Sequence, residues 1–140
     1  MIPARIVQLV RRRARCRCEY CGLHEDQDAF FSFHIEHIVA EQHGGVAVPE
    51  NLALACQHDN VHKGPNLTGI DPRTGKLTRL FNPRRQRWSR HFRFVRGAIV
   101  GRTAVGRTTV RVLALNAPDR LALREALLEA GELAAPAGEG

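Results

Sequence analysis

The chain has 140 residues, of which 21 are Lys or Arg and 14 are Asp or Glu, so its formal net charge at pH 7 is +7. This length predicts one domain with a modest core, and the 44% hydrophobic content argues against a disordered chain. No apolar run approaches the length of a membrane span, and positive charge follows the first apolar stretch instead of preceding it. We therefore expect a cytoplasmic protein without a secretory signal, and the basic balance favours a polyanionic partner.

The charge is distributed unevenly along the chain. Residues 21–60 contain no Lys or Arg but hold seven acidic residues, and six of the seven histidines lie in or next to this stretch. Thirteen basic residues lie between Lys63 and Arg111, against the single acid Asp71, and a second basic run covers residues 11–17. A centre suited to metal binding is thus flanked by segments suited to phosphate, which favours nucleic acid as the partner.

The first half of the chain predicts a compact α+β unit. We expect a helix at residues 6–15, a tight knuckle from Cys18 to Gly22, and an alternating strand at residues 31–38. A second strand is expected at residues 51–56, and a helix beginning at Gln57 and stopping near Gly64.

The second half is expected to be a basic extension. Residues 65–83 contain turn signals and predict mainly loop, and residues 110–115 predict a strand. Residues 118–130 predict a helix, with Leu121, Leu127 and Leu128 facing the core. The domain prediction is one unit over residues 1–131, with a core at 15–64 and an extension at 65–131, followed by a flexible tail at 132–140.

Cysteines spaced as metal ligands flank the predicted hairpin. Cys18-x2-Cys21 precedes it and Cys56 follows it, so a zinc ion held by all three would compensate for the small core. The fourth ligand stays open, because Asp59 occupies the position where a second C-x2-C pair would have a thiol; Asp59, His58 and Cys16 are the alternatives. A finger built on Cys18, Cys21, His34 and His37 is rejected, since both histidines lie in a predicted strand instead of a helix.

Several short motifs occur in a characteristic order between these cysteines. They are Phe33-His34-Ile35-Glu36-His37-Ile38, His43-Gly44-Gly45, Glu50-Asn51-Leu52, Cys56 and Asn60-Val61-His62-Lys63-Gly64. Together they resemble the HNH endonuclease family, and the resemblance extends towards Trp88 as in bacterial single-domain members. It implies a small ββα-metal core, here with knuckle-like cysteines, an N-terminal helix and a C-terminal strand–helix extension.

The resemblance also implies the roles of individual residues. His37 would be the general base that takes a proton from water, and Asn51 would orient the loop and the His37 ring. Glu36 and Asn60 would bind a catalytic divalent cation, Mg²⁺ or Mn²⁺. Oxygen ligands suit such a cation, and an imidazole suits proton transfer near neutral pH. Glu36 and His37 would point to opposite faces of a regular strand, so they can share a site only where the strand ends or twists.

These assignments predict a metal-dependent endonuclease acting on nucleic acid, DNA first, with RNA not excluded. Phosphate contacts are expected from Lys63, Arg84, Arg85 and Arg87, while Trp88 and the aromatic residues near it pack inward. The alternative is a non-catalytic, zinc-stabilised module that binds nucleic acid. A toxin-like nuclease ranks lower because no delivery segment is evident. The sequence predicts neither a target sequence nor an oligomeric state.

Overall fold

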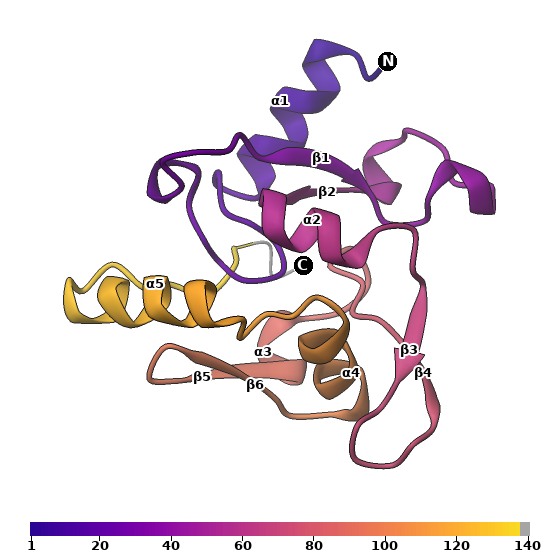
Figure 1. Cartoon of the computed structure of the whole chain (residues 1–140). Helices are drawn as coiled ribbons and strands as arrows, with labels where there is room; N and C mark the ends of the chain where they lie inside the picture. The colour runs from indigo at the N-terminus through magenta and orange to yellow at the C-terminus, as the bar shows by residue number, and fades with distance from the viewer. Residues whose placement is uncertain (138–140) are drawn as a thin grey trace.

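The computed structural model describes residues 1–137, and its first half is a ββα unit. Strands β1 (His34–His37) and β2 (Leu52–Ala55) form an antiparallel pair in which His34 faces Ala55 and His37 faces Leu52. Helix α2 (Gln57–Lys63) follows β2 after one residue and lies beside the pair (Figure 1). The predicted α+β class and ββα order are therefore confirmed, although β1 is shorter than the strand expected at residues 31–38.

Helix α1 (Ala4–Arg13) covers the other side of this strand pair. Val10 of this helix and Ala14, the residue that caps its C-terminus, pack against Leu52 and Leu54 of β2 and form a small core separate from the larger one. Ile6 packs against the same core, and its spacing of four from Val10 places both on one helical face. Both belong to the apolar residues from which the helix was predicted.

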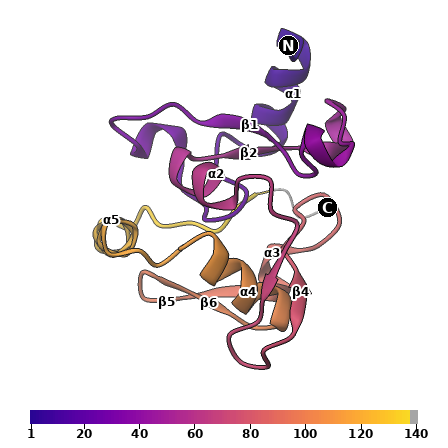
Figure 2. The same ribbon diagram turned by 45° about the vertical axis from the view of Figure 1, so that its right-hand side comes forward.

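The second half forms a lower layer built from two hairpins and three helices. Its elements are β3 (Thr68–Ile70), β4 (Leu77–Arg79), α3 (Trp88–His91), β5 (Phe92–Val95), β6 (Ala98–Gly101), α4 (Ala104–Val112) and α5 (Pro118–Glu129). Strand β3 pairs with β4 and β5 pairs with β6, both antiparallel. The views in Figures 1 and 2 agree that this layer lies under the ββα unit, with the β3–β4 hairpin at one end. The short 3-10 turns Glu25–Gln27, Glu41–His43 and Pro49–Asn51 lie in the ββα half.

One prediction for the extension is wrong. Residues 65–83 are mainly loop, as expected, and contain the short β3–β4 hairpin, but residues 110–115 are the end of α4 and a following turn instead of a strand. The β-branched residues of this segment favour a strand by propensity. The segment is helical for two reasons. Thr103 caps the helix, because its side chain accepts a hydrogen bond from the Gly106 amide, and Gly106 lacks a Cβ atom, so the helix can approach the His91 carbonyl.

The main core joins the two halves. Trp88 and Phe92 are buried with Leu113 and Leu115 beneath the cysteine knuckle, and the Trp88 indole donates a hydrogen bond to the Tyr20 carbonyl oxygen. The inward packing of the aromatic residues thus matches the expectation. Leu127 also packs against this core, but Leu128 is 45% exposed and does not face it as predicted.

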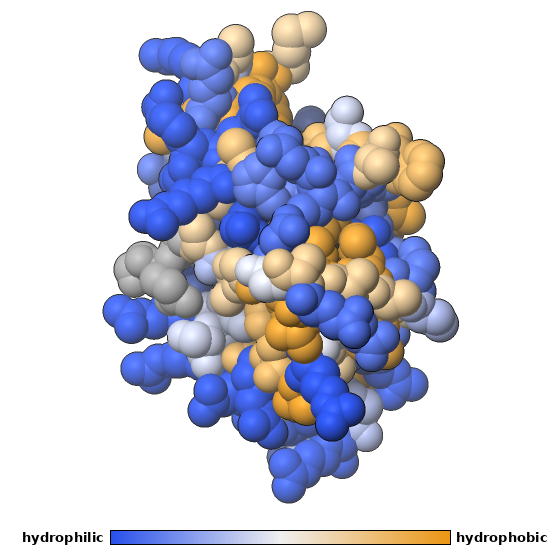
Figure 3. All heavy atoms as spheres, turned by 90° about the vertical axis from the view of Figure 1, so that its left-hand side faces the viewer, coloured by the Kyte–Doolittle hydropathy of each residue, from blue (hydrophilic) through white to orange (hydrophobic). Residues whose placement is uncertain are grey.

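The surface is mixed. Figure 3 shows hydrophilic side chains over the upper and lower parts of one face, with an apolar band across its middle. Among residues 1–137, no helix combines the length and apolarity needed to cross a membrane.

The segment after α5 was predicted to be a flexible tail. Residues 132–137 turn back towards the knuckle: Pro136 is buried, and a Cβ atom on Gly22 would come within 2.2 Å of the Ala134 carbonyl oxygen. Gly22 also has a φ of +82°, so both the close approach of Ala134 and the backbone conformation require glycine at this position. Residues 138–140 of the predicted tail lie outside the described residues.

Candidate active site and metal centre

The ββα unit brings three of the expected site residues to one open cleft of about 310 Å³, while Asn51 lies outside its lining. Glu36 and His37 at the end of β1 and Asn60 on α2 all line it. Because β1 ends at His37, the chain turns immediately, and consecutive side chains can reach the same hollow. The other lining residues are Ala40, Glu41, Gln42, Gly64 and Pro65. Glu41 and Gln42 were not singled out in the sequence; an acid four residues after His37, in the same loop, was the available signal.

Glu36 is the buried member of this cleft, with only 5% of its surface exposed. The Tyr20 hydroxyl donates to Glu36 Oε1 at 2.6 Å, and Lys63 Nζ lies 2.8 Å from Glu36 Oε2. Burial raises the pKa of Glu36 above its usual value, while the ammonium of Lys63 and the hydroxyl of Tyr20 oppose that rise. Tyr20 was missed in the sequence because its place between Cys18 and Cys21 suggested only a spacer.

Lys63 does not have the exposed position expected of a phosphate contact. It is 2% exposed, and its ammonium donates to the Ile38 carbonyl oxygen at 3.0 Å while pairing with Glu36. The charge therefore points inward, towards the end of β1. Its position in α2, on the face turned towards the strand, explains the difference.

Asn51 fastens the loop that follows His37. Its amide nitrogen donates to the Val39 and Val46 carbonyl oxygens at 2.9 and 3.0 Å, and its Oδ1 accepts from the Val39 amide at 2.9 Å. Gly45 lies against the same loop, where a Cβ atom would meet the Val39 carbonyl oxygen at 1.7 Å. Asn51 thus closes the loop at both ends and fixes the direction in which the chain leaves His37.

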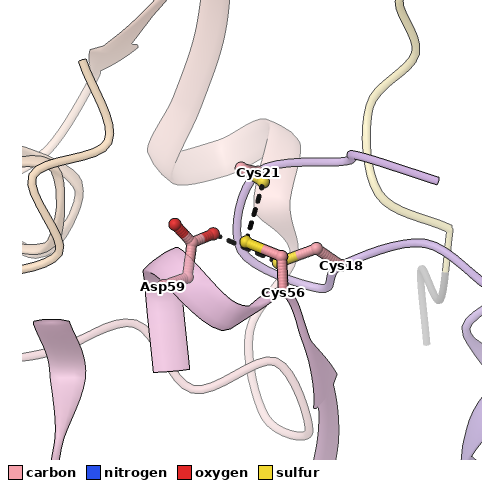
Figure 4. Close-up of side chains that lie close together, drawn as sticks. All are labelled: Cys18, Cys21, Cys56 and Asp59. Atoms are coloured by element: carbon pink, nitrogen blue, oxygen red, sulfur yellow. Dashed lines mark hydrogen bonds between the residues drawn. The ribbon is translucent and has the colours of Figure 1, made fainter. Parts of the chain in front are cut away.

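A second cluster lies at the junction of the knuckle, β2 and α2. Cys18, Cys21, Cys56 and Asp59 are all buried, and one ligand atom from each lies within 4.8 Å of the others. Figure 4 shows the four side chains pointing towards one another, with Cys21 Sγ 3.9 Å from Cys56 Sγ and Cys18 Sγ 3.1 Å from Asp59 Oδ2. Ligands about 2.3 Å from a tetrahedral zinc ion would have sulfur atoms about 3.8 Å apart, so the donor set fits that ion.

Burial makes two groups of this cluster hard to ionise unless a cation is beside them. Burial raises the pKa of the Cys18 thiol and of the Asp59 carboxyl well above their usual values. Hydrogen bonds with Cys18 and then Cys21 lower the pKa of Cys56 to about 6. A divalent cation would reverse the cost of ionising the buried groups, since metal ligands bind deprotonated.

Arg120 of α5 adds a positive charge next to the cluster. Its Nη2 lies 3.6 Å from Cys56 Sγ. The sequence did not mark it, because it is an ordinary arginine in an amphipathic helix more than sixty positions from Cys56. Only folding brings α5 to the knuckle.

The expected phosphate-binding arginines are not equivalent. Arg84 forms an ion pair with Glu19, whose carboxylate is buried and also accepts a hydrogen bond from the Leu54 amide at 2.8 Å. Arg84 thus holds the knuckle to the extension. Arg85 and Arg87 are exposed.

The model of the family described as HNH endonuclease matches residues 18–66, which include both clusters. The chain carries an HNH endonuclease domain. The matched segment begins at the first cysteine of the knuckle and ends just after α2, so the HNH domain coincides with the ββα unit. No curated protein and no solved structure matches the chain.

The match of residues 18–66 to the HNH endonuclease model supports a nuclease-type function in general and a nucleic acid as partner. HNH nucleases depend on a metal ion, and the three cysteines with Asp59 form a cluster suited to one. The cleft can be tested in the same way. Each carboxylate oxygen of Glu36 contacts one donor, Tyr20 Oη or Lys63 Nζ, so each keeps one lone pair for a cation. With the Asn60 amide on the same cleft, the oxygen donors fit a hard divalent cation.

Proposed function

We propose that this HNH protein is a divalent-metal-dependent endonuclease that hydrolyses phosphodiester bonds, those of DNA first. The observation that carries the proposal is the convergence of Glu36, His37 and Asn60 on one solvent-open cleft. RNA remains an alternative substrate, and the extension supplies the positive charge that either polymer requires.

In this mechanism His37 acts as the general base. Its imidazole accepts a proton from a water molecule positioned in the cleft, and the water oxygen attacks the phosphorus atom of the bound phosphodiester. The bond from phosphorus to the 3′ oxygen breaks, and this oxygen takes up a proton from solvent, leaving a 5′-phosphate and a 3′-hydroxyl. Asn51 holds the loop after His37 and so fixes the approach of the ring. A Mg²⁺ or Mn²⁺ ion, held by Glu36 and Asn60, would supply neutralisation of the charge that develops on phosphate.

Plasmid nicking tests the role of His37. With Mg²⁺ or Mn²⁺, His37→Ala is expected to slow nicking about 10²–10⁴-fold, the usual contribution of a general base, while leaving DNA binding intact. EDTA is expected to stop nicking. The matched control is His43→Ala, which removes an exposed imidazole from the same loop. Nicking that His37→Ala does not slow would refute the assignment.

We further propose that Cys18, Cys21, Cys56 and Asp59 hold a structural zinc ion. Native mass spectrometry is expected to find one zinc ion in the wild type and none in Cys18→Ser. Cys16→Ser is the control, because Cys16 lies outside the cluster and should leave the zinc in place. A metal-free wild type that melts at the same temperature with and without added zinc would contradict the proposal.

A second candidate is a non-catalytic module that binds nucleic acid on a zinc-stabilised scaffold. The observation that favours it is the ion pair between Glu36 and Lys63, which already neutralises the carboxylate beside the cleft. Titration with Mn²⁺, followed by electron paramagnetic resonance, separates the two. A catalytic domain is expected to bind Mn²⁺ more weakly after Asn60→Ala, whereas a non-catalytic one shows no binding that depends on Asn60.

A further inference from the structure

A second cavity is lined by Lys63, the partner of Glu36 in the cleft. It measures about 300 Å³, which is at the lower end of the range for small-molecule sites, about 300–1,000 Å³. It is formed where the end of β1 and α2 of the HNH domain meet the β3–β4 hairpin and the segment after it. Its lining residues are Ile38, Val39, Lys63, Asn66, Leu67, Thr68, Arg79, Leu80, Phe81, Asn82, Arg85 and Gln86.

The lining combines three kinds of chemistry. Its apolar part includes the buried side chains of Leu80 and Phe81. Amide side chains, among them Gln86, supply hydrogen-bond donors and acceptors, and the exposed Arg79 and Arg85 place two guanidinium groups beside them. A flat heteroaromatic ring joined to a phosphate matches this combination, since its faces are apolar, its edge is polar and its phosphate is anionic.

The cavity is also coupled to the candidate active site. Lys63 lines the cavity, while its ammonium lies 2.8 Å from Glu36, which lines the cleft. The same ammonium bonds to the carbonyl oxygen of Ile38, another residue of the cavity. A group bound in the cavity would therefore be separated by the Lys63 side chain from Glu36 and the cleft, where the phosphodiester is expected.

We propose that this cavity binds one unstacked nucleobase of the nucleic-acid substrate, with Arg79 and Arg85 on the adjoining phosphates. The inference rests on the proposed endonuclease function and adds a base subsite to it. An enzyme that takes a base out of its stack favours single-stranded, damaged or mismatched positions, because unstacking costs least there. The proposal therefore makes substrate preference a property of the extension as well as of the HNH domain.

Binding of single nucleotides tests the subsite without relying on cleavage. The probes are the four deoxynucleoside 5′-monophosphates, titrated into the ¹⁵N-labelled full chain, and 2-deoxyribose 5-phosphate, which lacks the base, is the matched probe. We expect at least one mononucleotide to shift the amide resonances of Leu67, Thr68, Leu80 and Phe81, and the sugar phosphate to leave them in place. Equal shifts with the sugar phosphate, or no shifts at all, would overturn the base subsite.

Two tryptophan variants locate the binding. Thr68 faces Arg79 across the hairpin, and both line the cavity, so Thr68→Trp is expected to block it. We expect this variant to weaken mononucleotide binding by about tenfold or more, within the range set by the loss of base stacking. Ile70→Trp places the same ring on the same strand outside the cavity lining, where Ile70 is already 50% exposed, and should bind like the wild type. Equal weakening by both variants would overturn the location.

Plasmid nicking separates this inference from the proposed function. If the wild type nicks DNA and His37→Ala does not, while no mononucleotide shifts the cavity resonances, the base subsite is wrong and the endonuclease stands. If mononucleotides bind in the cavity but the wild type never nicks DNA or RNA, the endonuclease is wrong. The cavity would then be a nucleotide site, but not the substrate subsite proposed here.

Discussion

Three buried polar side chains determine the state of the candidate active site. Glu36 lies between the hydroxyl of Tyr20 and the ammonium of Lys63, and all three are at most 5% exposed. An isolated carboxylate in this position would be costly, because burial disfavours its charge. Lys63 therefore acts on the cleft through Glu36, as a positioning residue, and not by direct contact with phosphate.

Removing the ammonium tests this arrangement. We expect Lys63→Met to lower the free energy of unfolding by about 3–5 kcal/mol, because it leaves Glu36 buried without its cation. The measurement is urea denaturation of the zinc-loaded protein. Lys76→Met, which removes an exposed lysine, is the control and should change little. The double variant Glu36→Gln/Lys63→Met is expected to recover part of the loss. If Lys63→Met were as stable as the control Lys76→Met, the ion pair between Glu36 and Lys63 would contribute nothing to stability.

At the scale of elements, the sequence predicted the HNH domain better than the extension. A helix was expected to begin at Gln57, and the structure has α2 there; the two strands also appear in the expected order. Local signals sufficed there, because alternation, a turn and a short connection lie close together in the chain. In the extension, Val110 and its neighbours predicted a strand, yet the cap at Thr103 and the close packing of Gly106 against the His91 carbonyl make them helical. Those contacts depend on tertiary structure.

The candidate site divides in the same way. The residue types and their order predicted which side chains gather, as the cleft at Glu36, His37 and Asn60 shows. The direction of a long side chain was not predictable. Lys63 could have pointed to solvent or inward, and the choice depends on where β1 ends relative to α2. Arg84 likewise pairs with Glu19, a partner 65 positions earlier in the chain.

Helix α5 is the element that adds charge to the cysteine cluster. A zinc ion with three thiolates and one carboxylate would carry a net charge of about −2, and Arg120 Nη2 lies 3.6 Å from Cys56 Sγ. We expect Arg120→Ala to weaken zinc binding about 10–100-fold, the usual cost of losing a partner of a metal ligand. Competition with a chromogenic chelator measures it.

Matched variants separate charge from helix stability in that experiment. Arg111→Ala removes an exposed arginine from α4 and should leave zinc affinity unchanged. Arg120→Lys keeps the charge and should restore part of the affinity. Zinc held as tightly by Arg120→Ala as by Arg111→Ala would mean that the guanidinium does not support the cluster.

For the whole molecule, the contacts that join the two halves are polar as well as apolar. Trp88 donates a hydrogen bond to the knuckle, and Arg84 forms an ion pair with Glu19. These contacts hold the extension to the HNH domain beside the cysteine cluster. Farther away, Asp71, the residue after β3, accepts two hydrogen bonds from Arg107 of α4, at 2.8 and 3.0 Å. This pair fixes the β3–β4 hairpin, which forms one wall of the second cavity, to helix α4.

The Asp71–Arg107 pair predicts how stability depends on pH. Hydrogen bonds from Arg107, above all, hold the pKa of Asp71 below its usual value of 3.8. The unfolded chain therefore binds a proton at a higher pH than the folded protein does. The stabilisation is complete well above pH 3.8 and is lost as the pH falls through that value towards the lowered folded pKa. We expect Asp71→Asn to be less stable than the wild type near neutral pH, and the difference in melting temperature to narrow below about pH 4. Melting curves between pH 2.5 and 7 measure it, with Asp119→Asn, an exposed acid of α5, as the control. A difference that stays constant down to pH 2.5 would mean that Asp71 does not titrate with folding, and that the hairpin is held by packing against α4 alone.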